Sequence, residues 1–125
     1  MRTRLSLVII FTTACLVGVS AAPMFHCELI RSLPSAGVTL KTPPARLQLW
    51  FSQVPAQDVS TISLKAGAKA VAVGKTVIVP AEKSMYVEPA SPLAAGSYTL
   101  HWRGAGDDGH VQQGDIAFTI GTKQP

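Results

Sequence analysis

Short runs in which apolar side chains occupy every second position recur along the chain. The run RLQLWF places Leu47, Leu49 and Phe51 on one face, with Gln48 and Trp50 on the other. A period of two is typical of a β-strand that buries one face. Two later runs, SYTLHWR and DIAFTI, alternate in the same way, and TVIVP and STISL are rich in β-branched residues. We therefore expect strands at all five runs.

The spacing of turn-forming residues predicts the fold class, and the alternation in the later runs predicts the core. Proline and glycine interrupt the chain roughly every ten residues, and the best helical candidate, 66–72, is cut by glycines. Short strands with such spacing predict an all-β fold, a Greek-key β-sandwich or barrel of about seven strands that is immunoglobulin-like. The first strand is expected near His26–Ser32, and the last to end at Ile120. In the runs SYTLHWR and DIAFTI, the side chains expected to face inward are Tyr98, Leu100, Trp102, Ile116, Phe118 and Ile120.

The first residues differ from the rest of the chain. Arg2 and Arg4 precede an apolar run over 5–19, and small residues follow. This layout is typical of a cleavable secretory signal peptide, here 1–21, and the apolar run is shorter than the roughly 20 residues that span a bilayer. Residues 22–125 are then one domain, exported to the periplasm and not embedded in a membrane.

Removal of that segment changes the charge and the cysteine count. Without Arg2 and Arg4, nine basic residues face seven acidic ones, a net charge of +2. No basic run remains, so nucleic acid is not an expected partner. Cys15 is lost with the signal peptide, which leaves Cys27 without an intramolecular disulfide partner. A lone thiol in an oxidising compartment is buried, paired between chains or bound to a metal.

Polar residues interrupt the apolar pattern in the segment GAGDDGHVQQGDIAF. In an extended segment Asp108 and His110 point to the same side, where a carboxylate and an imidazole can bind one ion. Gly109 allows the backbone to turn between them, and Asp107 is more simply a solvated loop acid. Strand ends distant in sequence meet at one pole of a sandwich, so His26 can join this pair.

Each of these residues also has a structural interpretation. A single histidine at a strand end is more often a surface hydrogen-bonding group than a metal ligand, and His101 is expected to be structural. Cys27 is more simply a small buried apolar residue. Trp50 and Trp102 are expected to pack rather than to form a binding platform. The residues alone therefore leave the metal site open.

The order of several motifs resembles the CopC family of periplasmic copper-resistance and copper-trafficking proteins. The opening HCELIRSLPSAG is similar to the family's first strand, and LQLWFSQ to a strand that ends there in Phe-Ser-Glu. The segment EPASPLAAGSYTLHWRGAGDDGHVQQGDIAFTI is similar to the family's Pro-Leu-x-x-Gly-x-Tyr strand, its Trp-Arg pair and its Asp-x-His pair. The resemblance covers His26 to Ile120 and implies a Greek-key β-barrel or sandwich.

The resemblance also implies a function. It implies a periplasmic protein that carries or buffers copper, as Cu(II), and passes it to an inner-membrane copper transporter. The implied ligands are His26, Asp108 and His110, with Cys27 as a further candidate that would favour Cu(I). No catalytic constellation is present in the sequence, so we do not expect an enzyme.

Three departures from the family pattern support an alternative function. His26 is not the first residue after the expected cleavage at Ala21, so its amine is not a terminal donor. Gln53 replaces an acidic residue, and the segment KAGAKAVAVGK contains no methionine. The alternative is an exported β-sandwich interaction module that has lost the metal site.

Overall fold

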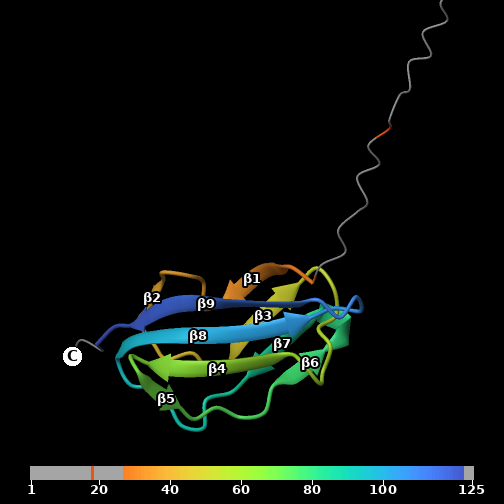
Figure 1. Cartoon of the computed structure of the whole chain (residues 1–125). Helices are drawn as coiled ribbons and strands as arrows, with labels where there is room; N and C mark the ends of the chain where they lie inside the picture. The colour runs from red at the N-terminus through yellow and green to blue at the C-terminus, as the bar shows by residue number, and fades with distance from the viewer. Residues whose placement is uncertain (1–17, 19–26, 123–125) are drawn as a thin grey trace, which may run out of the picture.

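The computed structural model describes Gly18 and residues 27–122 of the chain. Apart from Gly18, the predicted signal peptide, 1–21, lies outside the described residues, and so does His26. In the described part, no helix has the length and apolar character needed to cross a bilayer. Nine strands and one short 3₁₀ turn, η1 (Pro80–Glu82), form two packed sheets (Figure 1).

The smaller sheet is antiparallel and has four strands in the order β1-β3-β7-β6. Its register pairs Leu49 of β3 with Met85 of β7, and a bulge separates Leu29 from Arg31 in β1. The bounds of its strands are β1 Leu29–Leu33, β3 Leu47–Phe51, β6 Val77–Val79 and β7 Ser84–Val87.

The larger sheet has five strands in the order β2-β9-β8-β4-β5. A long antiparallel ladder joins β8 to β9 from the Gly96–Ile120 pair at one end to the Ala105–Val111 pair at the other. The short strand β2 is parallel to β9. The bounds are β2 Thr39–Leu40, β4 Thr61–Ala66, β5 Lys69–Val71, β8 Gly96–Ala105 and β9 Val111–Ile120.

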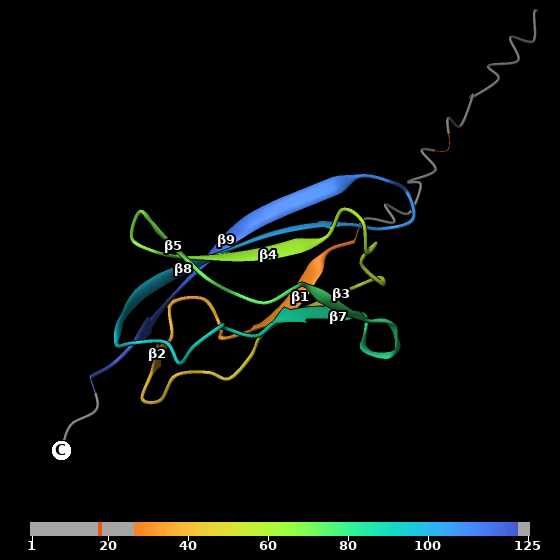
Figure 2. The same cartoon turned by 90° about the horizontal axis from the view of Figure 1, so that it is seen from below.

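The predicted fold class is confirmed, and the two sheets lie face to face as a β-sandwich (Figure 2). The described residues form nine strands rather than about seven. The predicted runs include β6 but not β2, β5 or β7, and β2 and β5 are only two or three residues long. Such short edge pairings leave no clear alternation in the sequence. The region 66–72, the best helical candidate, forms the turn and second strand of the β4–β5 hairpin.

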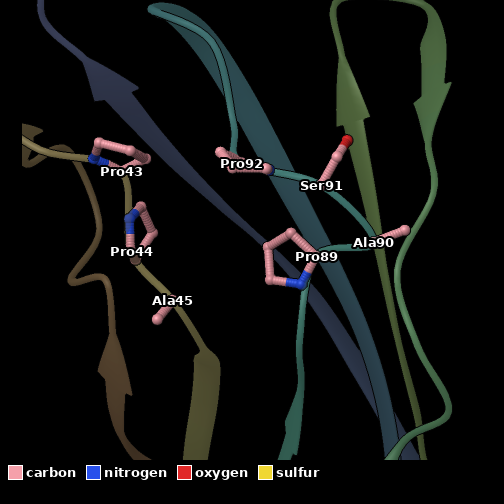
Figure 3. Close-up of a pocket in the computed structure, with 7 residues that line it drawn as sticks. All are labelled: Pro43, Pro44, Ala45, Pro89, Ala90, Ser91 and Pro92. Atoms are coloured by element: carbon pink, nitrogen blue, oxygen red, sulfur yellow. The ribbon is translucent and has the colours of Figure 1, made fainter.

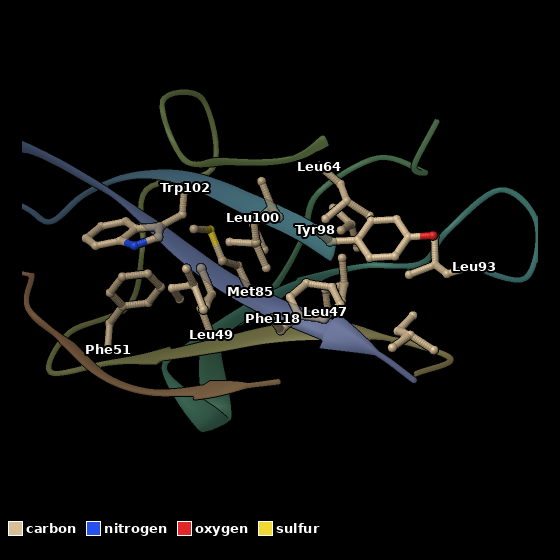
Figure 4. Close-up of a cluster of buried hydrophobic side chains, with 14 of the residues drawn as sticks. Leu47, Leu49, Phe51, Leu64, Met85, Leu93, Tyr98, Leu100, Trp102 and Phe118 are labelled. Carbon is tan, nitrogen blue, oxygen red and sulfur yellow. The ribbon is translucent and has the colours of Figure 1, made fainter. Parts of the chain in front are cut away.

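The side chains that alternate inward fill the space between the sheets (Figure 4). Phe51 meets Trp102 edge to face, with ring centroids 5.4 Å apart, and Tyr98 stacks on Phe118 at 5.5 Å. The hydroxyl of Tyr98 donates a hydrogen bond to the carbonyl of Ala94 at 2.6 Å, so its polar end is satisfied at the core boundary. All the residues that the three alternating runs place inward are buried: Leu47, Leu49, Phe51, Tyr98, Leu100, Trp102, Ile116, Phe118 and Ile120.

Candidate metal centre

The loop between β8 and β9 holds the acidic residues and the histidine that interrupt the apolar pattern. The chain turns at Asp107 and Asp108, and Gly109 has a φ of +73°. The backbone N–H of Gly109 donates to the carbonyl of Gly106 at 3.1 Å and closes the turn. Glycine is favoured at position 109 because a side chain strains a backbone with positive φ.

Asp108 and His110 are in direct contact in this turn. One carboxylate oxygen, Oδ1 of Asp108, accepts from the backbone N–H of His110 at 3.1 Å. The other oxygen, Oδ2, lies 3.1 Å from Nδ1 of the His110 ring. Contact with a carboxylate at Nδ1 fixes the orientation of an imidazole and places Nε2 on the opposite side of the ring, as in many metal sites.

The geometry of this pair corrects one detail of the sequence interpretation. Strand alternation predicts that Asp108 and His110 share a side because the segment is extended. The structure shows a turn instead, and β9 begins only at Val111. The two side chains meet because an Asp side chain readily caps the backbone two residues later. The convergence was predicted correctly, but its cause was not.

Cys27 lies beneath this turn and precedes β1. Its side chain is only 1% exposed, and its thiol donates a long hydrogen bond to the carbonyl of Gln53 at 3.6 Å. Burial raises the pKa of the Cys27 thiol, a backbone hydrogen bond at Gln53 acts in the opposite direction, and the charges of Asp108 and Asp107 raise the pKa further. The expectation that Cys27 is a buried apolar residue therefore agrees with its environment.

Gln53 packs closely against Gly106 at the base of the β8–β9 turn. A Cβ atom at Gly106 would lie 2.4 Å from Oε1 of Gln53 and 3.1 Å from Cβ of Cys27. Three segments distant in sequence therefore meet at Gly106: Cys27 before β1, Gln53 at the start of the loop after β3, and the end of β8. Sequence analysis noted Gln53 only as a departure from a family pattern, because no local pattern reveals such a three-way contact.

The predicted site residues are placed unequally. The structure brings Asp108 and His110 together and puts Cys27 close to them, while His26 lies outside the described residues. Within residues 27–122 no group of three His, Cys, Asp or Glu side chains is arranged to hold a metal ion. His101 is elsewhere, on the outer face of the larger sheet. Its Nδ1 lies 2.6 Å from Oδ1 of Asp115, its cross-strand neighbour, which supports the structural role expected for it.

The two tryptophans pack as expected. Trp102 is buried against Phe51, and the guanidinium of Arg31 lies over the ring of Trp50 at 3.9 Å from the ring centroid. The arginine occupies the ring face that a flat ligand would need.

A surface hollow lies at the opposite end of the sandwich, between the β2–β3 and β7–β8 connections (Figure 3). Its volume is about 400 Å³. Its walls contain no titratable or metal-binding side chain, so it offers no chemistry comparable with that of the β8–β9 turn. The lining residues are Pro43, Pro44, Ala45, Pro89, Ala90, Ser91 and Pro92.

Comparison with known proteins gives consistent relatives. A family model described as the CopC domain matches residues 29–121. The chain is 31% identical to a copper resistance protein C of Pseudomonas syringae pv. tomato, over 94% of this chain and 96% of that protein. It is 32% identical to a copper resistance protein C of Escherichia coli, over 89% and 94% of the two chains.

Two solved structures share the fold. The crystal structure of CopC from Methylosinus trichosporium OB3b matches with a TM-score of 0.72 and 25% identity, over 80% of this chain and 98% of that chain. The structure of PcoC, described as a methionine-rich copper resistance protein from Escherichia coli, matches with a TM-score of 0.69 and 31% identity, over 76% and 98% of the two chains.

Proposed function

Because the chain belongs to the CopC family, we propose that it is a periplasmic copper-binding protein that carries or buffers Cu(II) and passes it to a membrane partner. The proposed ligands are His26, Asp108 and His110. Residues 1–21 serve as the signal peptide, and 22–125 as the copper-binding domain. The observation that carries the proposal is the contact of Asp108 with the His110 ring. The relatives' name, copper resistance protein C, supports copper as the ion.

The donor set suits Cu(II). Imidazole and carboxylate are ligands that Cu(II) accepts in a tetragonal arrangement, and copper forms the strongest complexes of the first-row divalent ions. The contact at Nδ1 of His110 directs Nε2 outward as the ligand atom. In our proposal the carboxylate of Asp108 both orients the ring of His110 and binds the ion.

His26 precedes Cys27 in the sequence, and Cys27 lies against Gly106, so we propose His26 as the third donor. A third donor from this position brings the number of donors in the site closer to the four that copper prefers. Cys27 contributes less in our proposal. Its pKa is raised by burial, which keeps the sulphur protonated, whereas metals bind the thiolate.

The proposal predicts that copper binding depends on His110 and on pH. Loss of a ligand is expected to weaken Cu(II) binding by at least tenfold in His110→Ala. Acidification is expected to release copper, because imidazole binds metal only in its neutral form. The measurement is a Cu(II) titration of the purified protein, followed by electron paramagnetic resonance, with His101→Ala as the matched control. That control removes an imidazole held by Asp115 on the outer face of the sheet.

Equal affinities of the wild type and of His110→Ala would refute the proposed site. They would favour the alternative, an exported sandwich that interacts with other proteins without a metal. A loss of binding in His101→Ala as large as that in His110→Ala would also contradict the assignment, because it would move the copper to the outer face of the larger sheet.

A further inference from the structure

The end of the sandwich that carries Asp108 and His110 has a surface of its own, which we call the copper pole. It consists of the segments 27–30, 52–60 and 104–111. We propose that the copper pole is the docking surface for the protein that receives the metal, and that the receiving surface is basic with an apolar centre. This inference rests on the proposed function and specifies the partner that the function requires.

Hydrogen bonds tie the three segments of the copper pole together. The N–H of Ala56 donates to the carbonyl of Ala105 at 2.8 Å, and the N–H of Ala105 lies 3.4 Å from the hydroxyl of Ser60. The N–H of Ser52 donates to the carbonyl of Glu28 at 2.9 Å. Both views of the fold show the β3–β4 connection and the β8–β9 turn at the same end of the molecule (Figures 1 and 2). These hydrogen bonds fix the three segments relative to one another, so the copper pole is one surface rather than three independent loops.

Exposed apolar side chains gather at this pole. Val54 and Val59 are each 39% exposed in the β3–β4 connection, and Val111 is 42% exposed directly after His110. Ile30 is 65% exposed at the start of β1. Of the six large apolar side chains that are exposed in the described residues, these four belong to the copper pole. Single exposed apolar residues are common, but a cluster around a polar site is typical of an interaction surface.

The charges of the same segments have one sign. Four of the seven acidic residues of the chain lie in them: Glu28, Asp58, Asp107 and Asp108. The three segments contain no lysine or arginine, but two exposed arginines, Arg31 and Arg103, directly adjoin them. The adjoining turn at η1 adds one charge of each sign, Glu82 and Lys83.

The opposite end of the larger sheet has the opposite charge. Lys65 and Lys69 are exposed there, beside the β4–β5 turn. With Arg31 and Arg103 included, the end at the copper site carries four acidic against two basic residues, so its net charge is still negative.

This combination specifies the partner by its chemistry. A basic surface is attracted to the acidic pole, and the attraction raises the rate of encounter. An apolar centre on the partner would pack against Val54, Val59 and Val111 and exclude water from the metal during the exchange of ligands. The acidic pole also repels a second copy of itself, so the chain is not its own preferred acceptor.

A test uses an acceptor of the stated chemistry made from the chain itself. Glu28→Lys, Asp58→Lys and Asp107→Lys together give a basic pole that keeps Asp108, His110 and the three valines. Copper-loaded, ¹⁵N-labelled wild type is mixed with this unlabelled acceptor. Paramagnetic Cu(II) broadens the amide signals of the β8–β9 turn, and their recovery reports the rate of transfer. If the triple variant does not fold, the acceptor is Asp58→Lys with Asp107→Lys.

We expect transfer to the basic acceptor at least tenfold faster than to unlabelled wild type, with the difference shrinking as salt is added. Changing Val54, Val59 and Val111 to Thr in the donor is expected to slow the transfer several-fold, because threonine keeps the shape of valine but adds a hydroxyl. Val77→Thr is the matched control, since Val77 is also 39% exposed but lies on β6. The copper affinities of all variants are measured first, so that a change in transfer rate can be separated from a change in affinity.

The outcomes separate the two claims. Equal transfer rates to both acceptors, or equal effects of Val77→Thr and of the three valine changes, would overturn the docking surface while leaving copper binding intact. A wild type that binds no copper would instead refute the proposed function. In a final control a small chelator replaces the acceptor protein. Equal rates of copper loss from donors with and without the valine changes would then confirm that the valines act through contact with a protein.

Discussion

Asp108 has two contacts in the β8–β9 turn, and they respond differently to substitution. Its Oδ1 accepts from the backbone N–H of His110, while Oδ2 contacts the ring. An asparagine keeps an oxygen for the backbone contact but loses the negative charge. We therefore expect Asp108→Asn to retain the fold of the turn and to weaken Cu(II) binding by about 10- to 100-fold.

The matched control for this prediction is Asp107→Asn, which removes the same charge one residue earlier. It is expected to change the equilibrium affinity for Cu(II) much less, because Asp107 is not among the proposed ligands. Calorimetric titration of both variants measures the difference. Equal losses of affinity in the two variants would mean that net charge, and not contact with His110, makes Asp108 important.

Cys27 provides a prediction about stability and pH. Burial raises the pKa of its thiol in the folded protein above the ordinary value of a cysteine. The folded state then holds the proton more tightly than the unfolded chain does. The resulting stability is complete below the pKa of the unfolded thiol and is lost as the pH rises above it towards the folded pKa.

We expect the free energy of unfolding of the wild type to fall more steeply above pH 9 than that of Cys27→Ala. Urea unfolding at a series of pH values between neutral and alkaline measures both slopes, with copper absent. Parallel curves for the two proteins would show that the thiol has the same affinity for protons in both states.

At the scale of the elements, two glycines of the β8–β9 ladder differ in the space that neighbouring aromatic rings leave for a side chain. Gly114 lies opposite Trp102 in the register, and a Cβ atom there would be 2.9 Å from Nε1 of the ring. A Cβ at Gly104 would be 3.6 Å from the nearest atom of Phe51, which is an ordinary contact. The ring of Trp102 is packed against Phe51 and has little room to move.

Gly114→Ala is therefore expected to destabilise the protein by about 1–3 kcal/mol through overpacking. Gly104→Ala is expected to cost less than about 1 kcal/mol, since the added methyl group finds space and reduces the entropy of the unfolded chain. Urea unfolding of the two variants compares them directly. A greater loss in Gly104→Ala would contradict the packing of the ladder described above.

At the scale of the whole molecule, copper bound at the β8–β9 turn should stabilise the folded protein against unfolding. A ligand that binds only the folded state stabilises it by about 2.7 kcal/mol at a hundred times its dissociation constant. For a domain of this size that corresponds to a rise of roughly 10–20 °C in the melting temperature. Calorimetry with Cu(II), and again after a chelator, measures the shift.

The rise should vanish in His110→Ala and return to the copper-free value after chelation. A melting temperature that is insensitive to copper in the wild type would favour the alternative of a metal-free interaction module. Destabilisation by copper would indicate binding to the unfolded chain instead.

The sequence by itself determined the fold class and the core. Successive side chains on a strand point to opposite faces, so the spacing of Leu47, Leu49 and Phe51 already decides which side of β3 is buried. The same local rule identified the inward faces of β8 and β9. It could not identify β2 and β5, which are too short to show a period.

Only the tertiary structure decided how the candidate site is assembled. The contact of Gly106 with Gln53 and Cys27, and the turn that brings Asp108 to His110, depend on how strands far apart in sequence pair and on the backbone angles of one loop. Alternation is a property of neighbouring residues and carries no information about either. The clustering of apolar and acidic side chains at the copper pole arises in the same way, because three segments become one surface only when the two sheets close on each other.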